Sequence, residues 1–199
     1  MSAEKMREKY IEKRNNLWPS LEKGSSEEKR ILWEKKRKTG FVNIPRSMPI
    51  ILNIMDYLSN KAGHKTVRDT YLALWCRDFG TALVEIQDSE TLALEAGFTG
   101  SRATNTLNSK IKILGNEEAD GLGFIRTIKS NNDKYKHILM LNPMLIIHLH
   151  YYSGKLPKNK YDELYSRCID IGDNDLKIIQ DFQDEKLNLY KDYLDKLTA

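Results

Sequence analysis

Apolar residues recur every three to four positions along most of this chain, which is the spacing of one face of an α-helix. In the central part, three short runs are instead rich in strand-forming residues, at 82–86, 124–129 and 135–141. The helices predicted by the spacing run over residues 3–16, 27–38, 48–62, 66–79, 89–98, 100–114, 158–170 and 173–199. A further helix is expected after Asn142 and Pro143, where a buried strand ends. The pattern therefore predicts a mainly α fold with a small β-hairpin.

Three of the predicted helices begin next to a side chain that can cap a helix N-terminus. Ser47 precedes the helix whose first turn contains Pro49, and Ser89 and Thr99 stand at the starts of two later helices. A hydroxyl at such a position accepts a hydrogen bond from a backbone N–H of the first turn that has no partner within the helix. We therefore expect these three hydroxyls to cap their helices.

Changes in composition divide the chain into a basic helical arm at 1–40, a core at 41–150 and C-terminal helices at 151–199. The arm holds 12 Lys and Arg against 7 Asp and Glu, although the whole chain has a net charge of only +4. A local surplus of positive charge favours a polyanionic partner, and the alternative is a solvated charged helix. The arm has too few apolar residues to fold alone, so we expect Trp18 and Trp33 to tether it.

The helix at 100–114 has one apolar face and one polar face that lacks a carboxylate. Its apolar positions are Ala103, Leu107, Ile111 and Leu114. The opposite face carries Ser101, Asn105, Asn108, Ser109 and Lys112, with Arg102 beside them. Amide, hydroxyl and basic side chains are the ones that bond to base edges and phosphates of nucleic acids. The alternative is an ordinary solvated surface.

The runs at 124–129 and 135–141 are joined by a short polar segment, a pattern typical of a β-hairpin. The basic residues of this hairpin are Arg126, Lys129, Lys134 and Lys136, against the acidic Asp133. Its tip is therefore predicted to be basic and rich in hydrogen-bonding groups.

The order of these elements resembles that of a winged helix-turn-helix domain. The resemblance is carried by residues 92–128, LALEAGFTGSRATNTLNSKIKILGNEEADGLGFIRTI. This stretch has Leu-Ala before a Gly-containing turn, a Thr opening the next helix, a Leu ending that helix, and Gly-Leu-Gly-Phe before a hairpin. In such domains the second helix of the pair enters the DNA major groove, and the hairpin, called the wing, contacts the backbone or the minor groove.

By position, the resemblance implies DNA-contacting residues in both elements. Those in the helix are Ser101, Arg102, Asn105, Asn108, Ser109 and Lys112. Those in the wing are Arg126, Lys129, Asn131, Asn132 and Lys134. The loop GNEEADG at 115–121 departs from the tightest winged-helix pattern, and its acidic residues are expected to point away from DNA.

An apolar stripe near the C-terminus has heptad-like spacing. Its members are Leu187, Tyr190, Leu194 and Leu197, three, four and three residues apart. The stripe spans barely two heptads, whereas a sustained coiled coil needs at least three to four. Two interpretations remain open: the helix packs on its own domain, or it forms a homodimer contact.

Composition and motifs also limit the kinds of site and activity that we expect of this chain. The two cysteines lie far apart, which disfavours a disulfide framework or a zinc site and suits a reducing cytoplasm. The N-terminus lacks a signal-peptide pattern, and no apolar run is long enough to span a membrane. His148 and His150 lie two residues apart, whereas metal-binding pairs on a helix prefer a spacing of about four. With no common catalytic or phosphate-loop motif present, we expect no enzymatic activity, no cofactor and no metal.

These patterns favour a sequence-specific binder of double-stranded DNA. We expect a transcriptional regulator, or a replication or partition factor of a mobile genetic element such as a plasmid. Such a protein is expected in the bacterial cytoplasm, on the nucleoid or a plasmid, with a homodimer through the C-terminal helices as one arrangement. The alternative is a protein-interaction module that uses a winged fold to dock a partner.

Overall fold

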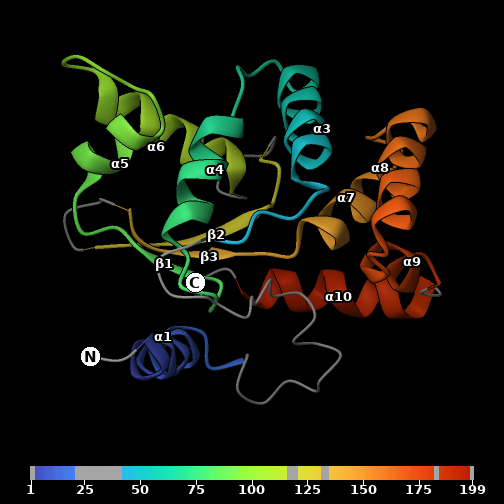
Figure 1. Cartoon of the computed structure of the whole chain (residues 1–199), viewed down its shortest axis with the longest axis horizontal. Helices are drawn as coiled ribbons and strands as arrows, with labels where there is room; N and C mark the ends of the chain where they lie inside the picture. The colour runs from blue at the N-terminus through green and yellow to red at the C-terminus, as the bar shows by residue number, and fades with distance from the viewer. Residues whose placement is uncertain (1–2, 21–41, 116–120, 131–134, 182–183, 198–199) are drawn as a thin grey trace.

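The computed structural model describes residues 3–20, 42–115, 121–130, 135–181 and 184–197, in which helices surround one small antiparallel sheet (Figure 1). The helices are α1 (Ala3–Leu17), α3 (Met48–Lys61), α4 (Arg68–Arg77), α5 (Ser89–Glu95), α6 (Ala103–Leu114), α7 (Pro143–Tyr152), α8 (Lys158–Ile171), α9 (Asp175–Gln180) and α10 (Asp184–Lys196). The strands are β1 (Leu83–Glu85), β2 (Ile125–Lys129) and β3 (Tyr135–Met140). The predicted mainly α fold with a small hairpin is confirmed, and β1 extends the hairpin to a three-stranded sheet. Within the described ranges, no helix has both the length and the apolar composition needed to cross a bilayer.

The sheet has β3 at its centre, with β1 on one side and β2 on the other, and both neighbours run antiparallel to it. Successive side chains of a strand point to opposite faces of a sheet. The register therefore places Glu85, Arg126 and His137 on one face. Val84 and Ile138 lie on the other face.

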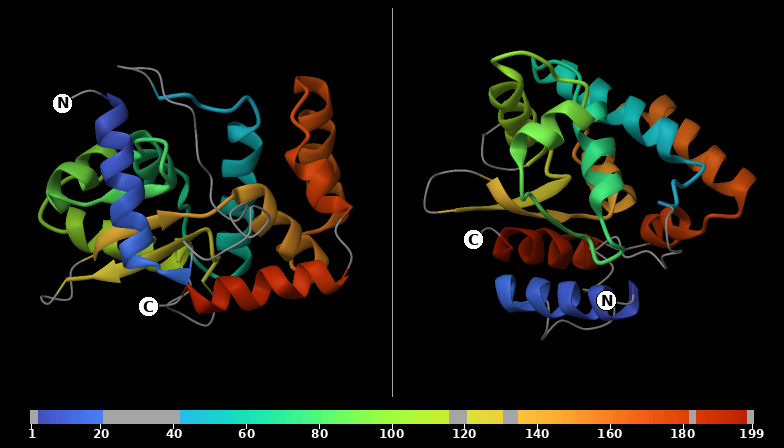
Figure 2. Two further views of the ribbon diagram at one scale, coloured as in Figure 1. Left: turned by 90° about the horizontal axis from the view of Figure 1, so that it is seen from below. Right: turned by 60° about the vertical axis from the view of Figure 1, so that its left-hand side comes forward.

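Helices cover both faces of this sheet (Figures 1 and 2). On one side lie α3 to α6, and the rings of Tyr71, Trp75 and Phe124 meet in the core there. On the other side lie α1 and α10, whose C-terminal ends come together (Figure 2). At that junction the indole Nε1–H of Trp18 donates to the carbonyl oxygen of Leu197 over 3.2 Å.

The expected tether at Trp18 is confirmed, because this side chain is 2% exposed and belongs to the main buried cluster. The helix predicted at 3–16 corresponds to α1 and packs on the core. The helix predicted at 27–38, and Trp33 within it, lie outside the described residues. The division of the chain near residues 40 and 150 stays a prediction.

The predicted cap of α5 is wrong by one residue. Asp88, and not Ser89, is the N-cap, and its carboxylate accepts hydrogen bonds from the backbone N–H groups of Glu90 and Thr91 at 3.0 and 3.2 Å. Asp88 has the extended backbone that a capping residue needs, whereas Ser89 is already inside the helix. For α3, Ser47 does occupy the N-cap position, but its hydroxyl makes no capping hydrogen bond.

The start of α6 also differs from the prediction. The helix begins at Ala103, and its N-cap is Arg102 instead of Thr99. The reason lies in the turn, where Gly97 and Gly100 have φ angles of +78° and +83°. Two left-handed residues this close together keep the chain turning past Thr99, so the first helical residue comes later.

The C-terminal region contains one more helix than the pattern predicts. The single helix expected at 173–199 is two, because α9 packs against α7 and α8 while α10 crosses the sheet (Figure 2). One straight helix cannot reach both surfaces. The heptad-like stripe Leu187, Tyr190, Leu194 and Leu197 is buried within the chain itself. The first interpretation of this stripe is therefore correct, and the stripe is not available as a homodimer contact while α10 is docked.

Candidate nucleic-acid interface

The helix α6 is anchored by its apolar side. Leu107, Ile111 and Leu114 are fully buried, and the helix packs against α5 and α4. Lys110 lies on this side too, and burial of its stem and ammonium group lowers its pKa, assisted by nearby Lys65. The predicted division of the helix into an apolar and a polar face is therefore confirmed.

The polar side of α6 reaches the surface. Ser101, Arg102, Asn105 and Ser109 are exposed, and Asn108 and Lys112 are half-buried. None of these six side chains has a hydrogen-bond or ion-pair partner within the part of the chain that the structure describes. Their donors and acceptors are therefore available to a ligand along one side of the helix.

Two carboxylates at the ends of α5, Asp88 and Glu95, already have partners. Arg77 of α4 holds the carboxylate of Glu95 through two hydrogen bonds of 2.6 and 3.0 Å. The carboxylate of Asp88 caps the N-terminus of α5. These two carboxylates therefore present little free negative charge beside α5, which favours the approach of a polyanion from that side.

The wing lies toward the same end of the molecule as α5 and α6 (Figures 1 and 2). Lys129 at the end of β2 and Lys136 on β3 are exposed, and the Lys129 ammonium lies 5.3 Å from the centre of the Tyr135 ring. The predicted contacts Asn131, Asn132 and Lys134 lie outside the described residues. Two basic side chains of the hairpin therefore stand on the same end as the polar side of α6.

Arg126 is a correction to the predicted wing contacts. It is only 6% exposed, and its guanidinium donates to the carbonyl oxygens of Ile125 and Leu194 at 3.0 and 3.4 Å. Strand alternation turns this residue toward the face that α10 covers, so it fastens α10 to β2 and does not reach the surface. The alternation was visible in the sequence, but not which face a helix would cover.

The histidines of α7 are buried. His148 Nδ1 lies 2.8 Å from the hydroxyl of Tyr161, and His150 Nε2 lies 2.8 Å from the carbonyl oxygen of Leu122. Among the described residues, no three His, Cys, Asp or Glu side chains gather in a way that suits a metal ion.

Comparison of the chain with protein-family models, with curated proteins and with solved structures gave no match. The assignment of a function therefore depends on the geometry of α6 and the hairpin.

Proposed function

We propose that this chain is a winged helix-turn-helix protein that binds double-stranded DNA, with α6 in the major groove and the β2–β3 hairpin on the backbone. The observation that supports this proposal is the polar side of α6. Its amide, hydroxyl and basic groups have no partner within the described residues, and this side of the helix contains no carboxylate. The element order from α4 to β3 and the strand order β1-β3-β2 also suit a winged domain.

The biological setting remains the one inferred from the sequence. We propose a transcriptional regulator, or a replication or partition factor of a bacterial mobile element, that acts in the cytoplasm. Selecting bound duplexes from a random pool tests sequence specificity directly. Recovery of one recurring site supports this function, and failure to enrich any sequence counts against it.

A salt titration tests the interface itself. If phosphates are contacted, the logarithm of the association constant falls linearly with the logarithm of salt concentration, with a slope of about −0.9 per contact. We expect a slope equivalent to several contacts. A flat dependence would point to the alternative, a module that docks a protein.

One observation favours that alternative. A groove of about 520 Å³ between α4 and the α5–α6 turn is lined by Leu72, Cys76 and Phe98 among others, and by the acidic Asp69 and Glu95. Glu95 is already paired with Arg77, so the half-apolar groove with Asp69 at its edge fits the apolar face of an amphipathic segment of another protein. Loss of partner binding on Leu72→Asp substitution, with DNA affinity unchanged, would separate the two functions.

Alanine substitution of Asn105 and Asn108 is expected to cost about 1–3 kcal/mol of binding free energy on the preferred duplex and little on random duplex. Asparagine bonds to base edges, so its loss removes sequence recognition more than general affinity. Binding of both duplexes is measured at one salt concentration. The control is Asn188→Ala, an exposed helical asparagine on α10. Equal losses on both duplexes would show that these amides do not read bases.

Alanine substitution of Lys129 and Lys136 is expected to flatten the salt dependence by up to about 0.9 for each lysine that contacts a phosphate. The free energy of unfolding should stay within about 0.5 kcal/mol, because both side chains are exposed. The matched control removes two exposed lysines from the C-terminal helices, Lys158 and Lys177. An unchanged slope in the hairpin variant would remove the wing from the interface.

A further inference from the structure

The sheet face that α1 and α10 cover (Figure 2) carries a buried histidine, His137. This residue is on β3, the central strand, and its side chain is 8% exposed. Neither of its ring nitrogens has a hydrogen-bond partner among the described residues. A buried imidazole without partners has lost the hydrogen bonds that water gives it, and this loss costs free energy.

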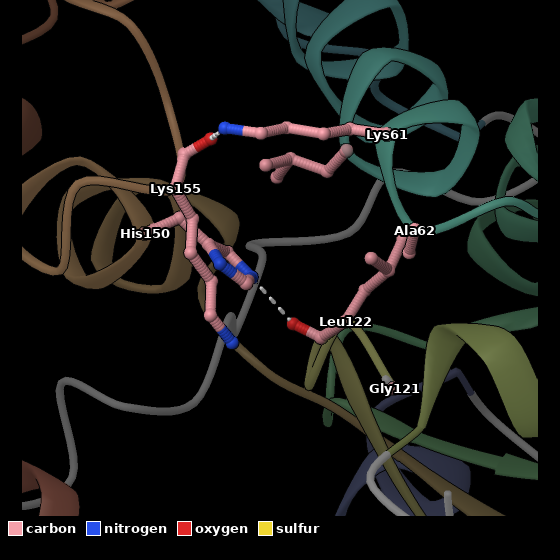
Figure 3. A pocket seen from close by; sticks show the side chains of 7 residues that line it. Lys61, Ala62, Gly121, Leu122, His150 and Lys155 are labelled. Atoms are coloured by element: carbon pink, nitrogen blue, oxygen red, sulfur yellow. Dashed lines mark hydrogen bonds between the residues drawn. The ribbon is translucent and has the colours of Figure 1, made fainter. Parts of the chain in front are cut away.

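The two buried histidines of α7 differ from His137 in this respect. His150 Nε2 lies 2.8 Å from the carbonyl oxygen of Leu122 (Figure 3), and His148 Nδ1 lies 2.8 Å from the Tyr161 hydroxyl. A hydrogen bond therefore holds each of these rings in place. No such bond holds the ring of His137, although this histidine is as deeply buried as the other two.

The acidic neighbour of His137 is Glu85, on the adjacent strand β1. Glu85 Oε1 lies 3.8 Å from His137 Nε2, which is beyond hydrogen-bond distance. The same oxygen lies 2.7 Å from the Nζ atom of Lys13, on α1. Burial raises the pKa of Glu85, but the hydrogen bond from Lys13 and its charge outweigh burial and lower this pKa. Glu85 is therefore ionised near neutral pH, and Lys13 and a protonated His137 compete for one oxygen.

The surroundings of His137 disfavour its protonation while α1 is docked. Burial is the largest effect and lowers the pKa of the ring. The positive charges of Lys13 and Lys136 lower this pKa further, and the negative charge of Glu85 opposes them. The docked structure therefore favours the neutral ring.

The other elements on this face bring three more polar side chains toward the site. From β2 comes Arg126, whose guanidinium donates to backbone carbonyl oxygens. From α10 comes Tyr190, which is 2% exposed, and from α1 comes Tyr10, whose pKa is raised by burial and by the charge of Glu85. Among these groups, Glu85 is the carboxylate that can pair with a protonated His137.

Several contacts of α1 lie close to this site. The ring of Tyr10 stacks on Phe79, and the Arg14 guanidinium donates to the Thr81 carbonyl oxygen over 3.0 Å. Phe79 and Thr81 belong to the turn between α4 and β1, and Lys13 binds β1 itself through Glu85. A charge that appears on β3 beside Lys13 therefore acts on the part of α1 that contacts the sheet.

We propose that His137 is a proton-controlled latch for α1. With the ring neutral, Lys13 binds Glu85 and α1 lies on the sheet. A proton taken up from solvent places a second cation beside Lys13 and competes with it for Glu85. Helix α1 then leaves the sheet, and its departure opens the charged ring to water. The latch lies on the side of the sheet opposite α6 and is independent of the interface proposed above.

The direction of the pH effect follows from the lowered pKa of His137 in the docked form. Once α1 leaves, water reaches the ring and its pKa returns toward the ordinary value of about 6.5. The released form therefore binds the proton more tightly. Docking is most favourable above about pH 6.5 and weakens as the pH falls below it, by up to about tenfold in the docking constant per pH unit.

NMR spectra of the full chain between about pH 8 and about pH 5 test the latch. The indole N–H resonance of Trp18 reports the docking of α1, because this group donates to the Leu197 carbonyl oxygen. The backbone amide of Ile111 reports α6. We expect the Trp18 signal to change to that of a released helix in step with the titration of the His137 ring, while the Ile111 signal is unchanged. A constant Trp18 signal while His137 titrates would overturn the proposal, as would loss of the Ile111 signal at the same pH.

Three variants separate the latch from general acid sensitivity. His137→Gln removes the titrating ring and should keep Trp18 docked over the whole pH range. Lys13→Gln leaves Glu85 free for the protonated ring, so its docking constant should fall no more than about twofold per pH unit below about pH 6.5. His64→Gln, at a half-buried histidine after α3, is the matched control and should keep the wild-type transition. An acid transition in His137→Gln or Lys13→Gln as steep as that of the wild type would contradict the proposal.

Discussion

Replacing Trp18 with alanine is expected to lower the free energy of unfolding by about 3–5 kcal/mol, a loss typical of a buried tryptophan. Trp18 directly follows α1, packs in the main buried cluster and donates its indole N–H to the carbonyl oxygen of Leu197 just after α10. The substitution opens a cavity at the junction of α1, α10 and the sheet. It also leaves the Leu197 carbonyl oxygen without this donor.

Other contacts of α1 depend on the same docking. The Arg14 guanidinium donates to the Thr81 carbonyl oxygen over 3.0 Å, and Lys13 forms an ion pair with Glu85 on β1 over 2.7 Å. The ring of Tyr10 stacks on Phe79 with ring centres 5.2 Å apart. Because all of these residues pack on the sheet side opposite α6, losing them should destabilise the protein without changing DNA affinity at low temperature.

Chemical denaturation followed by circular dichroism measures the effect of Trp18→Ala. For a chain of this size, a loss of 3–5 kcal/mol corresponds to a fall of roughly 6–20 °C in the melting temperature. Trp18→Phe keeps most of the volume but loses the N–H donor, and should cost about 1–2 kcal/mol. Leu189→Ala on α10 is the control, since this leucine is 51% exposed. An unfolding midpoint for Trp18→Ala equal to that of the control would mean that α1 is not docked in solution.

Replacing Asp56 with alanine is the second change with a large expected effect. We expect it to lower the free energy of unfolding by about 2–4 kcal/mol. Asp56 belongs to α3 and is 6% exposed, yet its carboxylate serves the start of α4. It accepts hydrogen bonds from the Thr66 hydroxyl at 2.7 Å, the Val67 N–H at 2.8 Å and the Arg68 N–H at 3.2 Å. The N-cap of α4 is Val67, whose side chain cannot cap, so a neighbouring helix supplies the acceptor. Alanine leaves these donors without that partner.

The effect of Asp56 should depend on pH. Burial by itself raises the pKa of this carboxyl, but the hydrogen bonds from Thr66, Val67 and Arg68 outweigh burial and hold the pKa below its usual value. A folded-state pKa below the unfolded value of about 3.9 means that the stabilisation is complete above that pH. It is lost as the pH falls through the folded-state pKa. The stability difference between wild type and Asp56→Ala should therefore be constant near neutral pH and shrink in acid.

Urea unfolding at several pH values measures this difference. Asp192→Ala, which removes an exposed carboxylate from α10, is the matched control and should change the free energy of unfolding by no more than about 0.5 kcal/mol. A stability difference that stays constant down to strongly acidic pH would show that the Asp56 carboxylate is not the stabilising group.

Local signals in the sequence were sufficient for much of the candidate interface. The apolar positions Leu107, Ile111 and Leu114 predicted the buried side of α6, and that side placed Asn105 and Ser109 in solvent. Helical periodicity identifies such a face because residues three and four apart stand together on one side of the helix. The hairpin was also predicted by local signals, namely two β-type runs joined by a short polar segment.

The position of Arg126 is a feature that local signals in the sequence did not predict. Its charge and its place in the hairpin predicted a DNA contact, but the outcome depended on α10, a helix some 60 residues later in the chain, which covers that face of the sheet. The cap on α4 is similar, since Asp56 reaches it only because α3 and α4 pack together. The hydrogen bond from Lys61 to the Lys155 carbonyl oxygen likewise joins α3 to the chain just after α7.

The sequence by itself determined most of the described helices, the hairpin and the two sides of α6, because these follow from periodicity within one short segment. The tertiary structure alone decided which face of the sheet is covered and which carboxylate caps α4. These depend on contacts between residues far apart in the chain, and no local pattern encodes which distant surface a given side chain will meet.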